Sequence, residues 1–254
     1  MNSLTVFLER SLNILMQKFK EGRNSISLEE HGNVHYLNKV IKGPKIDALR
    51  RFHNCLKWEE LRTKQIRLNS PELIGYDEDD LSLKYQWIEN ATSLEEELEG
   101  PSPNFKNRIV EAVNMLVTLH TSNLGNVSID SESELPQHES LLDSLDKYEY
   151  ASCTGAELEL FRLLQQDSEL IEAIMQSSED NEVCTCHGDI RLDQFIYTDD
   201  KLWIIDFEEF RKGDPTRDLA GIIGAIYFDC LLKTFTETTQ ETSNAKKVEA
   251  HMLE

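Results

Sequence analysis

One stretch, Cys186 to Gly221, constrains this chain more than any other part of it: CHGDIRLDQFIYTDDKLWIIDFEEFRKGDPTRDLAG. A polar cluster, His187-Gly188-Asp189, opens the stretch, and an amide, Gln194, follows shortly after it. A hairpin turn then leads into an apolar run that ends on Asp206, and a further acid, Asp218, comes later. Acids and an amide spaced around a hairpin in this way can converge on one point in space.

The residue types in this stretch suit one chemistry. Carboxylate and amide oxygens are the ligands that a hard cation such as Mg²⁺ takes in proteins. A carboxylate can also orient a hydroxyl group and accept its proton. The pattern therefore favours a site that holds a metal ion and a hydroxyl group beside a nucleotide phosphate.

The composition limits the class of protein. The chain has 254 residues, enough for one large domain or two lobes around a buried core. Its formal net charge of -21 argues against nucleic acid as a partner, because phosphates attract basic surfaces. The charge is compatible with a cationic substrate or a basic protein partner, although solubility alone is the simpler explanation.

The sequence also predicts where the protein resides. No run of about 18 apolar residues is present, so neither a spanning helix nor a membrane partner is expected. The N-terminal segment lacks the basic start and continuous apolar run of a signal peptide. The five cysteines fit neither a disulfide framework nor zinc-site spacing. These features predict a reduced, cytoplasmic protein.

Hydrophobic periodicity predicts an α+β chain of two lobes joined near Glu89. The first part is expected to combine helices at 4–20 and 47–65 with strands at 26–28, 34–40, 73–76 and 81–87, the first two strands being joined by a Gly32-Asn33 turn. Helices are expected from about residue 94, then at 105–120, 141–150, 156–176 and 220–232, with a surface loop at 121–140. The expected units are a small β-rich lobe (1–89), a larger, mainly helical lobe (90–235) and a fraying polar tail (236–254) whose HMLE end resembles a cloning remnant.

Two charged residues of the first lobe form a candidate pair. Lys39 lies among apolar residues of a predicted strand, and Glu60 lies near the centre of the apolar face of the 47–65 helix. A carboxylate on such a face needs a partner if it is buried, and Lys39 can provide one. The alternative is that both side chains are solvated surface charges.

Three motifs, HGDIRLDQF, IIDFEEF and GDPTRDLA, resemble those of the aminoglycoside phosphotransferase and choline kinase family, which has a bilobal protein-kinase-like fold. The resemblance covers most of the chain in order, and it is weaker before Pro71. It implies that Asp189 orients the acceptor hydroxyl and takes its proton. It also implies a magnesium site at Gln194 and Asp206, with Asp206 bridging the metal to the phosphates.

The resemblance assigns supporting roles to further residues. It implies that Asp218 and His187 brace the catalytic loop and that Lys39, paired with Glu60, holds the phosphates of ATP. The segment after the 81–87 strand becomes the hinge that contacts adenine through backbone groups: Trp87, Ile88, Glu89 and Asn90. Other polar residues near these motifs are interpreted as surface charges (Arg211, Lys212, Arg217) or as a packing or capping residue (His120).

Three features depart from the family pattern. Gln194 stands where an asparagine is usual, so retained metal binding with shifted geometry is expected. Gly32 is the one glycine between Ser25 and Lys39, where a glycine-rich loop would cover the phosphates. Few residues follow the 220–232 helix, where more helices usually wall the acceptor site. An open acceptor side favours a partner protein that completes it, or a larger acceptor.

The leading hypothesis is an ATP- and magnesium-dependent phosphotransferase acting on a hydroxyl of a small molecule or of peptide serine or threonine. The motif HGD-x-RLDQF is similar to that of the kinase-like subunits of lanthipeptide and thioamide-peptide biosynthesis. The alternative hypothesis is a pseudokinase-like binding subunit that supports a partner enzyme. It rests on Gln194 and the missing glycine-rich loop.

Overall fold

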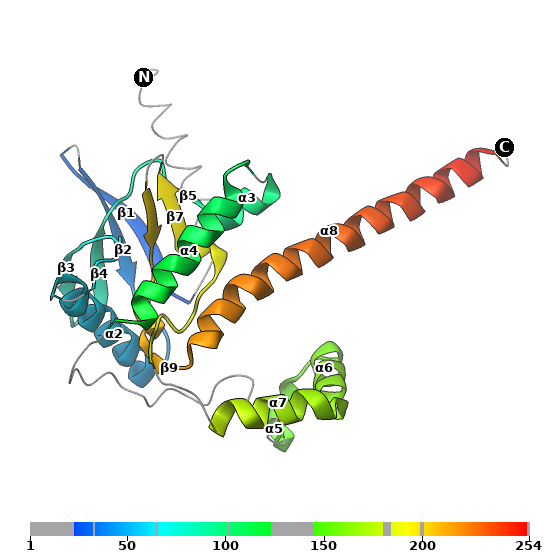
Figure 1. The fold of residues 1–254 in the computed structure, drawn as a ribbon, viewed down its shortest axis with the longest axis horizontal. Helices are drawn as coiled ribbons and strands as arrows, with labels where there is room; N and C mark the ends of the chain where they lie inside the picture. The colour runs from blue at the N-terminus through cyan, green and yellow to red at the C-terminus, as the bar shows by residue number, and fades with distance from the viewer. Residues whose placement is uncertain are drawn as a thin grey trace.

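The computed structural model shows an α+β architecture with a sheet-rich N-terminal part and a mainly helical C-terminal part (Figure 1). The residues that it describes are 23–32, 34–64, 66–100, 102–122, 145–179, 184–198 and 201–252. The predicted helix at 4–20 therefore lies outside the described residues, as does most of the predicted loop at 121–140.

The N-terminal sheet has four antiparallel strands in the order β1-β2-β4-β3. Their bounds are Ser25–His31 (β1), Val34–Val40 (β2), Leu73–Asp77 (β3) and Ser82–Gln86 (β4). The β1–β2 hairpin turns at Gly32, whose φ of 68° is favoured by glycine, as the sequence predicted. Helix α2 (Lys45–Lys64) connects β2 to β3.

Helix α2 contributes to both hydrophobic cores. Its Phe52 packs in a small cluster with Leu83 of the N-terminal sheet. Further along the same helix, Trp58 and Leu61 pack in the large cluster of the C-terminal part. Trp58 stacks on Phe207 with ring centroids 3.5 Å apart. One continuous helix therefore packs in both cores.

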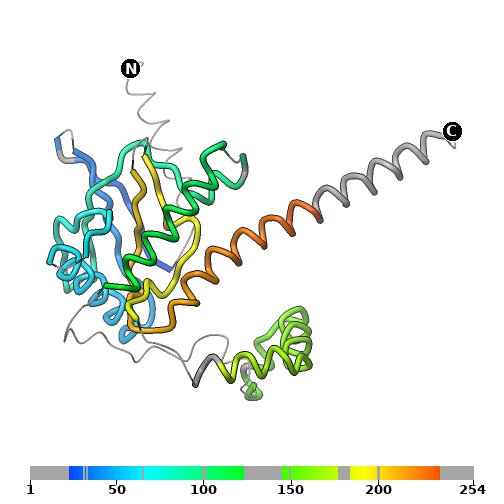
Figure 2. The backbone as a smooth tube through the Cα atoms, in the orientation of Figure 1, coloured from blue at the N-terminus to red at the C-terminus, as the bar shows by residue number. Residues whose placement is uncertain are grey.

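The C-terminal part combines helices with two small sheets. Strand β5 (Thr92–Ser93) pairs with β7 (Phe195–Thr198), which forms a hairpin with β8 (Lys201–Ile204). Strand β6 (Cys184–Cys186) pairs with β9 (Arg211–Gly213). Helix α3 (Leu94–Glu99) begins with a capping box between Ser93 and Glu96, and α4 (Phe105–His120) lies against the β7–β8 hairpin (Figure 2).

The remaining helices differ from the predicted ones in their bounds. A single helix was expected at 156–176, but α6 (Gly155–Gln166) and α7 (Ser168–Glu179) replace it. The break occurs at Asp167, whose side chain accepts the backbone N–H of Leu170 and so caps α7. Helix α5 (Lys147–Ser152) is short.

Helix α8 (Pro215–Met252) is much longer than the predicted 220–232 segment. In Figure 1 this helix extends away from the rest of the molecule. None of the helices in the described part of the chain combines the length and the apolar character needed to cross a bilayer.

Candidate active site

The loop that follows β6 is fixed by one buried carboxylate. Asp218, near the start of α8, is fully buried and accepts the backbone N–H groups of His187 (2.8 Å) and Gly188 (2.9 Å). His120 Nε2 donates to the same carboxylate at 2.9 Å. Burial raises the pKa of Asp218, but the hydrogen bonds of His120 and the loop N–H groups outweigh it and hold that pKa below its usual value. The loop conformation therefore depends on an ionised Asp218.

His187 and Gly188 press this loop onto the segment that contains Asp206. The His187 ring is buried, and its Nε2 donates to the carbonyl oxygen of Ile205 at 2.9 Å. Gly188 has a φ of 90°, and a Cβ there would lie 2.2 Å from the carbonyl oxygen of Glu209. Because a side chain would collide with backbone, this close approach requires glycine.

Asp189 is the acid that this loop presents to solvent. Its side chain is 39% exposed, and Oδ2 lies 2.8 Å from Nη1 of Arg191. Arg191 is itself half-exposed and also contacts Asp193. An exposed carboxylate beside a cation is accessible to a bound acceptor and to a phosphoryl group. Sequence reasoning missed Arg191. Its position two residues after Asp189, the candidate base, was the signal that could have placed it in the site.

Gln194 ends the short 3-10 helix η2 (Leu192–Gln194) with its side chain buried. Neither the oxygen nor the nitrogen of its amide has a hydrogen-bond partner among the described residues. A buried polar group without a partner costs free energy. The backbone oxygen of Gln194 accepts the N–H of Ile205 at 3.0 Å, so the amide lies beside the strand end that carries Asp206.

Asp206 occupies a left-handed backbone conformation, with a φ of 69°. This conformation is uncommon outside glycine, and it turns the chain sharply after β8. Its Oδ1 lies 2.5 Å from Nζ of Lys39. Desolvation raises the pKa of Asp206, but the charge and hydrogen bond of Lys39 outweigh it and hold the pKa below its usual range.

Lys39 pairs with Asp206 and Glu208, and the predicted pair with Glu60 is wrong. The lysine side chain is 7% exposed, and Nζ lies 2.8 Å from Oε2 of Glu208. Glu60 is 63% exposed and pairs with Lys64 one helical turn away. The buried face of α2 carries Arg51, Cys55 and Trp58 instead, so the helix is rotated relative to the expected orientation.

Glu208 is the second functional residue that sequence reasoning missed. It lies in the short helix η3 (Phe207–Glu209), and its side chain is 6% exposed. Besides Lys39, its carboxylate accepts Asn24 Nδ2 at 2.7 Å and lies 3.4 Å from Arg51 Nη1. The apolar residues Phe207 and Phe210, which anchor this segment in the core, were the available signal that an acid between them is buried.

The predicted hinge connects β4 to β5. Ile88 is buried, Asn90 has a positive φ of 54°, and Glu89 lies 3.5 Å from the His35 ring. The expected surface cluster of basic residues is only partly correct, because Arg211 in β9 is buried. Burial and the nearby charge of Arg217 lower the pKa of Arg211.

Solved structures with a similar backbone include a choline kinase and aminoglycoside phosphotransferases. Choline kinase LicA from Streptococcus pneumoniae matches with a TM-score of 0.54 and 19% identity over 89% of this chain and 76% of its own. The GDP complex of aminoglycoside 2'-phosphotransferase-IIIa matches with a TM-score of 0.55 and 14% identity, over 88% and 78%. The ADP-bound aminoglycoside phosphotransferase APH(2'')-Ib has a TM-score of 0.50 and 18% identity, over 82% and 73%.

The fold is therefore kinase-like, with a sheet-rich N-terminal lobe and a mainly helical C-terminal lobe. The family profile described as the phosphotransferase enzyme family matches residues 26–242, and the chain belongs to this family. No curated protein sequence matches the chain significantly. The fold and the family together define a phosphotransferase of the kinase type, in agreement with the resemblance in the sequence motifs.

Proposed function

We propose that this protein transfers the terminal phosphoryl group of a nucleoside triphosphate, bound with Mg²⁺, to an alcohol hydroxyl. The arrangement of Asp189 carries the proposal: an exposed carboxylate on a loop that Asp218 fixes. Asp206, which follows β8 and pairs with Lys39 of β2, supplies a second acid to the same site. ADP and GDP bound to similarly folded kinases support a nucleotide as the donor.

The residues present fit a magnesium ion. The Gln194 amide oxygen and the Asp206 carboxylate are both hard oxygen donors, and the buried amide has no partner among the described residues. We assign these two side chains as its protein ligands. The bound ion would offset the negative charge of the phosphates.

The cationic side chains are assigned to the phosphates. Lys39 pairs with Asp206 and with Glu208, so its Nζ is held beside the acid that we assign to the metal ion. Arg191 lies beside Asp189 and is assigned to the oxygens of the transferred phosphoryl group. The hinge residues Trp87, Ile88 and Glu89 are assigned to the nucleotide base through their backbone groups.

Asp189 is assigned as the residue that orients the acceptor and removes its proton. The acceptor oxygen forms a bond to the terminal phosphorus, and the bond from that phosphorus to the bridging oxygen breaks. The acceptor proton passes to the Asp189 carboxylate, and the nucleoside diphosphate leaves with the bridging oxygen.

We assign the acceptor to small polar alcohols that carry a positive charge. A choline kinase and aminoglycoside phosphotransferases are among the similar structures, and the formal net charge of -21 is compatible with a cationic acceptor. Serine or threonine of a peptide, as in lanthipeptide biosynthesis, is the narrower alternative that the same assay decides.

The test measures phosphoryl transfer from ATP and from GTP, with and without Mg²⁺, to choline, an aminoglycoside and a serine-containing peptide. Asp189→Asn is expected to lower kcat by about 10²-fold or more while nucleotide binding persists. Asp193→Asn is the matched control, because Asp193 is a nearby acid that also contacts Arg191. Wild-type protein that binds no nucleotide and phosphorylates no acceptor would contradict the proposal. Wild-type protein that is stabilised against unfolding by a partner protein and not by nucleotide would favour the binding-subunit alternative.

A further inference from the structure

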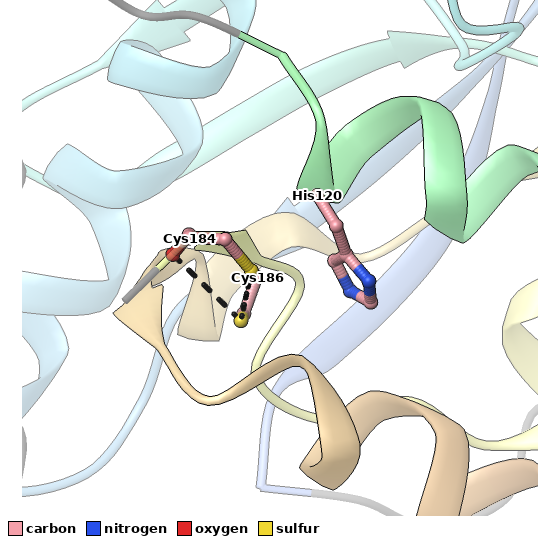
Figure 3. Close-up of side chains that lie close together, drawn as sticks. All are labelled: His120, Cys184 and Cys186. Carbon is pink, nitrogen blue, oxygen red and sulfur yellow. Dashed lines mark hydrogen bonds between the residues drawn. The ribbon is translucent and has the colours of Figure 1, made fainter. Parts of the chain in front are cut away.

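Two cysteines and a histidine meet beside the catalytic loop. Cys184 and Cys186 lie on β6, and His120 is the last residue of α4, facing them (Figure 3). The two Sγ atoms are 3.6 Å apart. One ligand atom from each of the three residues lies within 4.8 Å of the other two. The thiols have no part in the proposed phosphoryl transfer, so their meeting needs a separate explanation.

The local backbone places the sulfurs together. Alternate residues of a strand project to the same face, so Cys184 and Cys186 present their side chains side by side. The sequence motif alone did not indicate a metal site, because the third residue comes from a helix far away along the chain. Among the residues that the structure describes, this is the group of histidine, cysteine and acidic side chains arranged closely enough to hold an ion.

The spacing fits a small tetrahedral ion. Zinc–sulfur bonds of about 2.3 Å at a tetrahedral angle separate two sulfurs by about 3.8 Å. The Cys184 and Cys186 sulfurs already lie near this separation at 3.6 Å. Three protein ligands leave one tetrahedral position for water. Cys184 is only half-buried, so an ion can approach from its side.

We propose that His120, Cys184 and Cys186 form a binding site for a thiophilic divalent cation of the zinc type, separate from the magnesium site. Two sulfurs and one nitrogen are soft or borderline ligands, whereas Gln194 and Asp206 offer hard oxygens, so the two sites select different metals. Binding displaces the thiol protons to solvent and leaves two thiolates that neutralise the charge of the ion.

This site is connected to the catalytic loop through Asp218. The Asp218 carboxylate accepts both His120 Nε2 and the backbone N–H of His187. Histidines that ligate zinc commonly donate their other ring nitrogen to such a carboxylate. An ion bound to Nδ1 of His120 leaves the hydrogen bond from Nε2 to Asp218 in place, whereas an ion bound to Nε2 takes the place of that hydrogen bond. In either case the occupied site acts on the residue that fixes the loop carrying Asp189.

The test titrates Cd²⁺ into the full-length, metal-free protein, kept reduced with a phosphine, and follows the ultraviolet charge-transfer absorption of cadmium thiolates. One equivalent is expected to produce the band in wild type. Cys184→Ser and Cys186→Ser, each checked for folding by circular dichroism, should lose it. The double variant Cys153→Ser/Cys230→Ser is the matched control and should retain it, because those cysteines lie outside the cluster.

A second measurement keeps the proposal testable if a cysteine variant misfolds. Co²⁺ bound to the wild type should show the intense visible bands of a tetrahedral site with sulfur ligands. The absence of a Cd²⁺ band in wild type, its survival in well-folded Cys184→Ser, or weak octahedral Co²⁺ bands would overturn the proposal. These readouts need neither nucleotide nor acceptor, so they are independent of the proposed phosphotransferase activity.

Discussion

Glu208 is the residue whose role departs most from the sequence expectation. Its buried carboxylate contacts Lys39 of β2, Arg51 of α2 and Asn24 ahead of β1. It therefore joins the N-terminal sheet and α2 to the segment that follows Asp206. Arg51 is fully buried and is also held by Asp47, so this acid lies within a network of charged groups rather than in an isolated pair.

We expect Glu208→Gln to lower both stability and activity. The substitution leaves Lys39 and Arg51 buried with one carboxylate fewer. Breaking a buried ion pair in this way costs about 3–5 kcal/mol in the free energy of unfolding. A displaced Lys39 should also raise the KM for the nucleotide. Urea unfolding and steady-state kinetics measure the two effects.

Glu60→Gln provides the matched control for this prediction. Glu60 is an exposed acid of α2 whose side chain pairs with Lys64, far from the buried network. Its removal should leave the urea midpoint and the KM close to those of wild type. If Glu60→Gln lowered the urea midpoint and raised the KM as much as Glu208→Gln does, the pairing of Lys39 with Glu208 would be contradicted.

Asp218→Asn gives a prediction for the dependence of stability on pH. An amide retains one acceptor oxygen, so the loss of a charged hydrogen bond should reduce the free energy of unfolding by about 1.5–3 kcal/mol at pH 7. The pKa of Asp218 is lowered in the folded protein, so its stabilisation is present above the unfolded pKa and is lost as pH falls. The difference from wild type should therefore narrow below about pH 4. A difference that widens on acidification would contradict this assignment.

At the scale of elements, the start of α8 packs directly on the catalytic loop. A Cβ at Gly221 would lie 2.2 Å from the carbonyl oxygen of Ile190. The helix therefore approaches the loop most closely at Gly221, where a side chain would collide with backbone. Around Gly224 none of the residues that the structure describes, apart from its own helix, comes within 4 Å of the added carbon.

These two glycines of one helix form a matched pair of tests. Gly221→Ala should destabilise the protein by about 1–3 kcal/mol, because the backbone of the loop must move away. It should also lower kcat, since the loop carries Asp189. Gly224→Ala should leave activity unchanged and stabilise the helix by up to about 1 kcal/mol. A lower unfolding temperature for Gly224→Ala than for Gly221→Ala would contradict the packing of α8 on the catalytic loop at Gly221.

The elements that could be predicted from the sequence are those whose signals are local. The helix at 105–120, the turn at Gly32 and the strands before Glu89 follow from periodicity and turn residues in short windows. The partner of Lys39 could not be predicted in this way. An apolar stripe fixes the rotation of α2 only to within about one residue, or ~100°. Whether Glu60 or Glu208 reaches Lys39 is decided by tertiary packing.

The candidate site shows the same division. The order of Asp189, Gln194 and Asp206 around one hairpin led to the prediction of a site for magnesium and a hydroxyl group, and that assignment stays a prediction. The meeting of His120 with the cysteines of β6 depends on where α4 packs, and spacing along the chain carries no signal of it. The break at Asp167 was a local signal that was overlooked, because an acid can cap a new helix within a periodic segment.

At the scale of the whole molecule, α2 couples the lobes. Its Phe52 is buried in the N-terminal cluster, and its Trp58 stacks on Phe207, which follows Asp206 directly. A ligand that contacts both Lys39 and Asp206 therefore touches groups held by the same helix. We expect nucleotide binding to stabilise both lobes together, as a shift of one unfolding transition.

The size of that shift tests the metal assignment. At a nucleotide concentration of 100 times Kd, binding should add about 2.7 kcal/mol to the free energy of unfolding. Mg²⁺ should increase the shift in wild type and in Gln194→Asn, which keeps an amide oxygen. Gln194→Ala should lose the Mg²⁺-dependent part and keep the part due to nucleotide alone. Because the Gln194 amide is buried, each variant is compared with its own ligand-free unfolding curve. A Gln194→Ala protein that responds to Mg²⁺ as strongly as wild type would remove Gln194 from the site, leaving Asp206 as the assigned protein ligand.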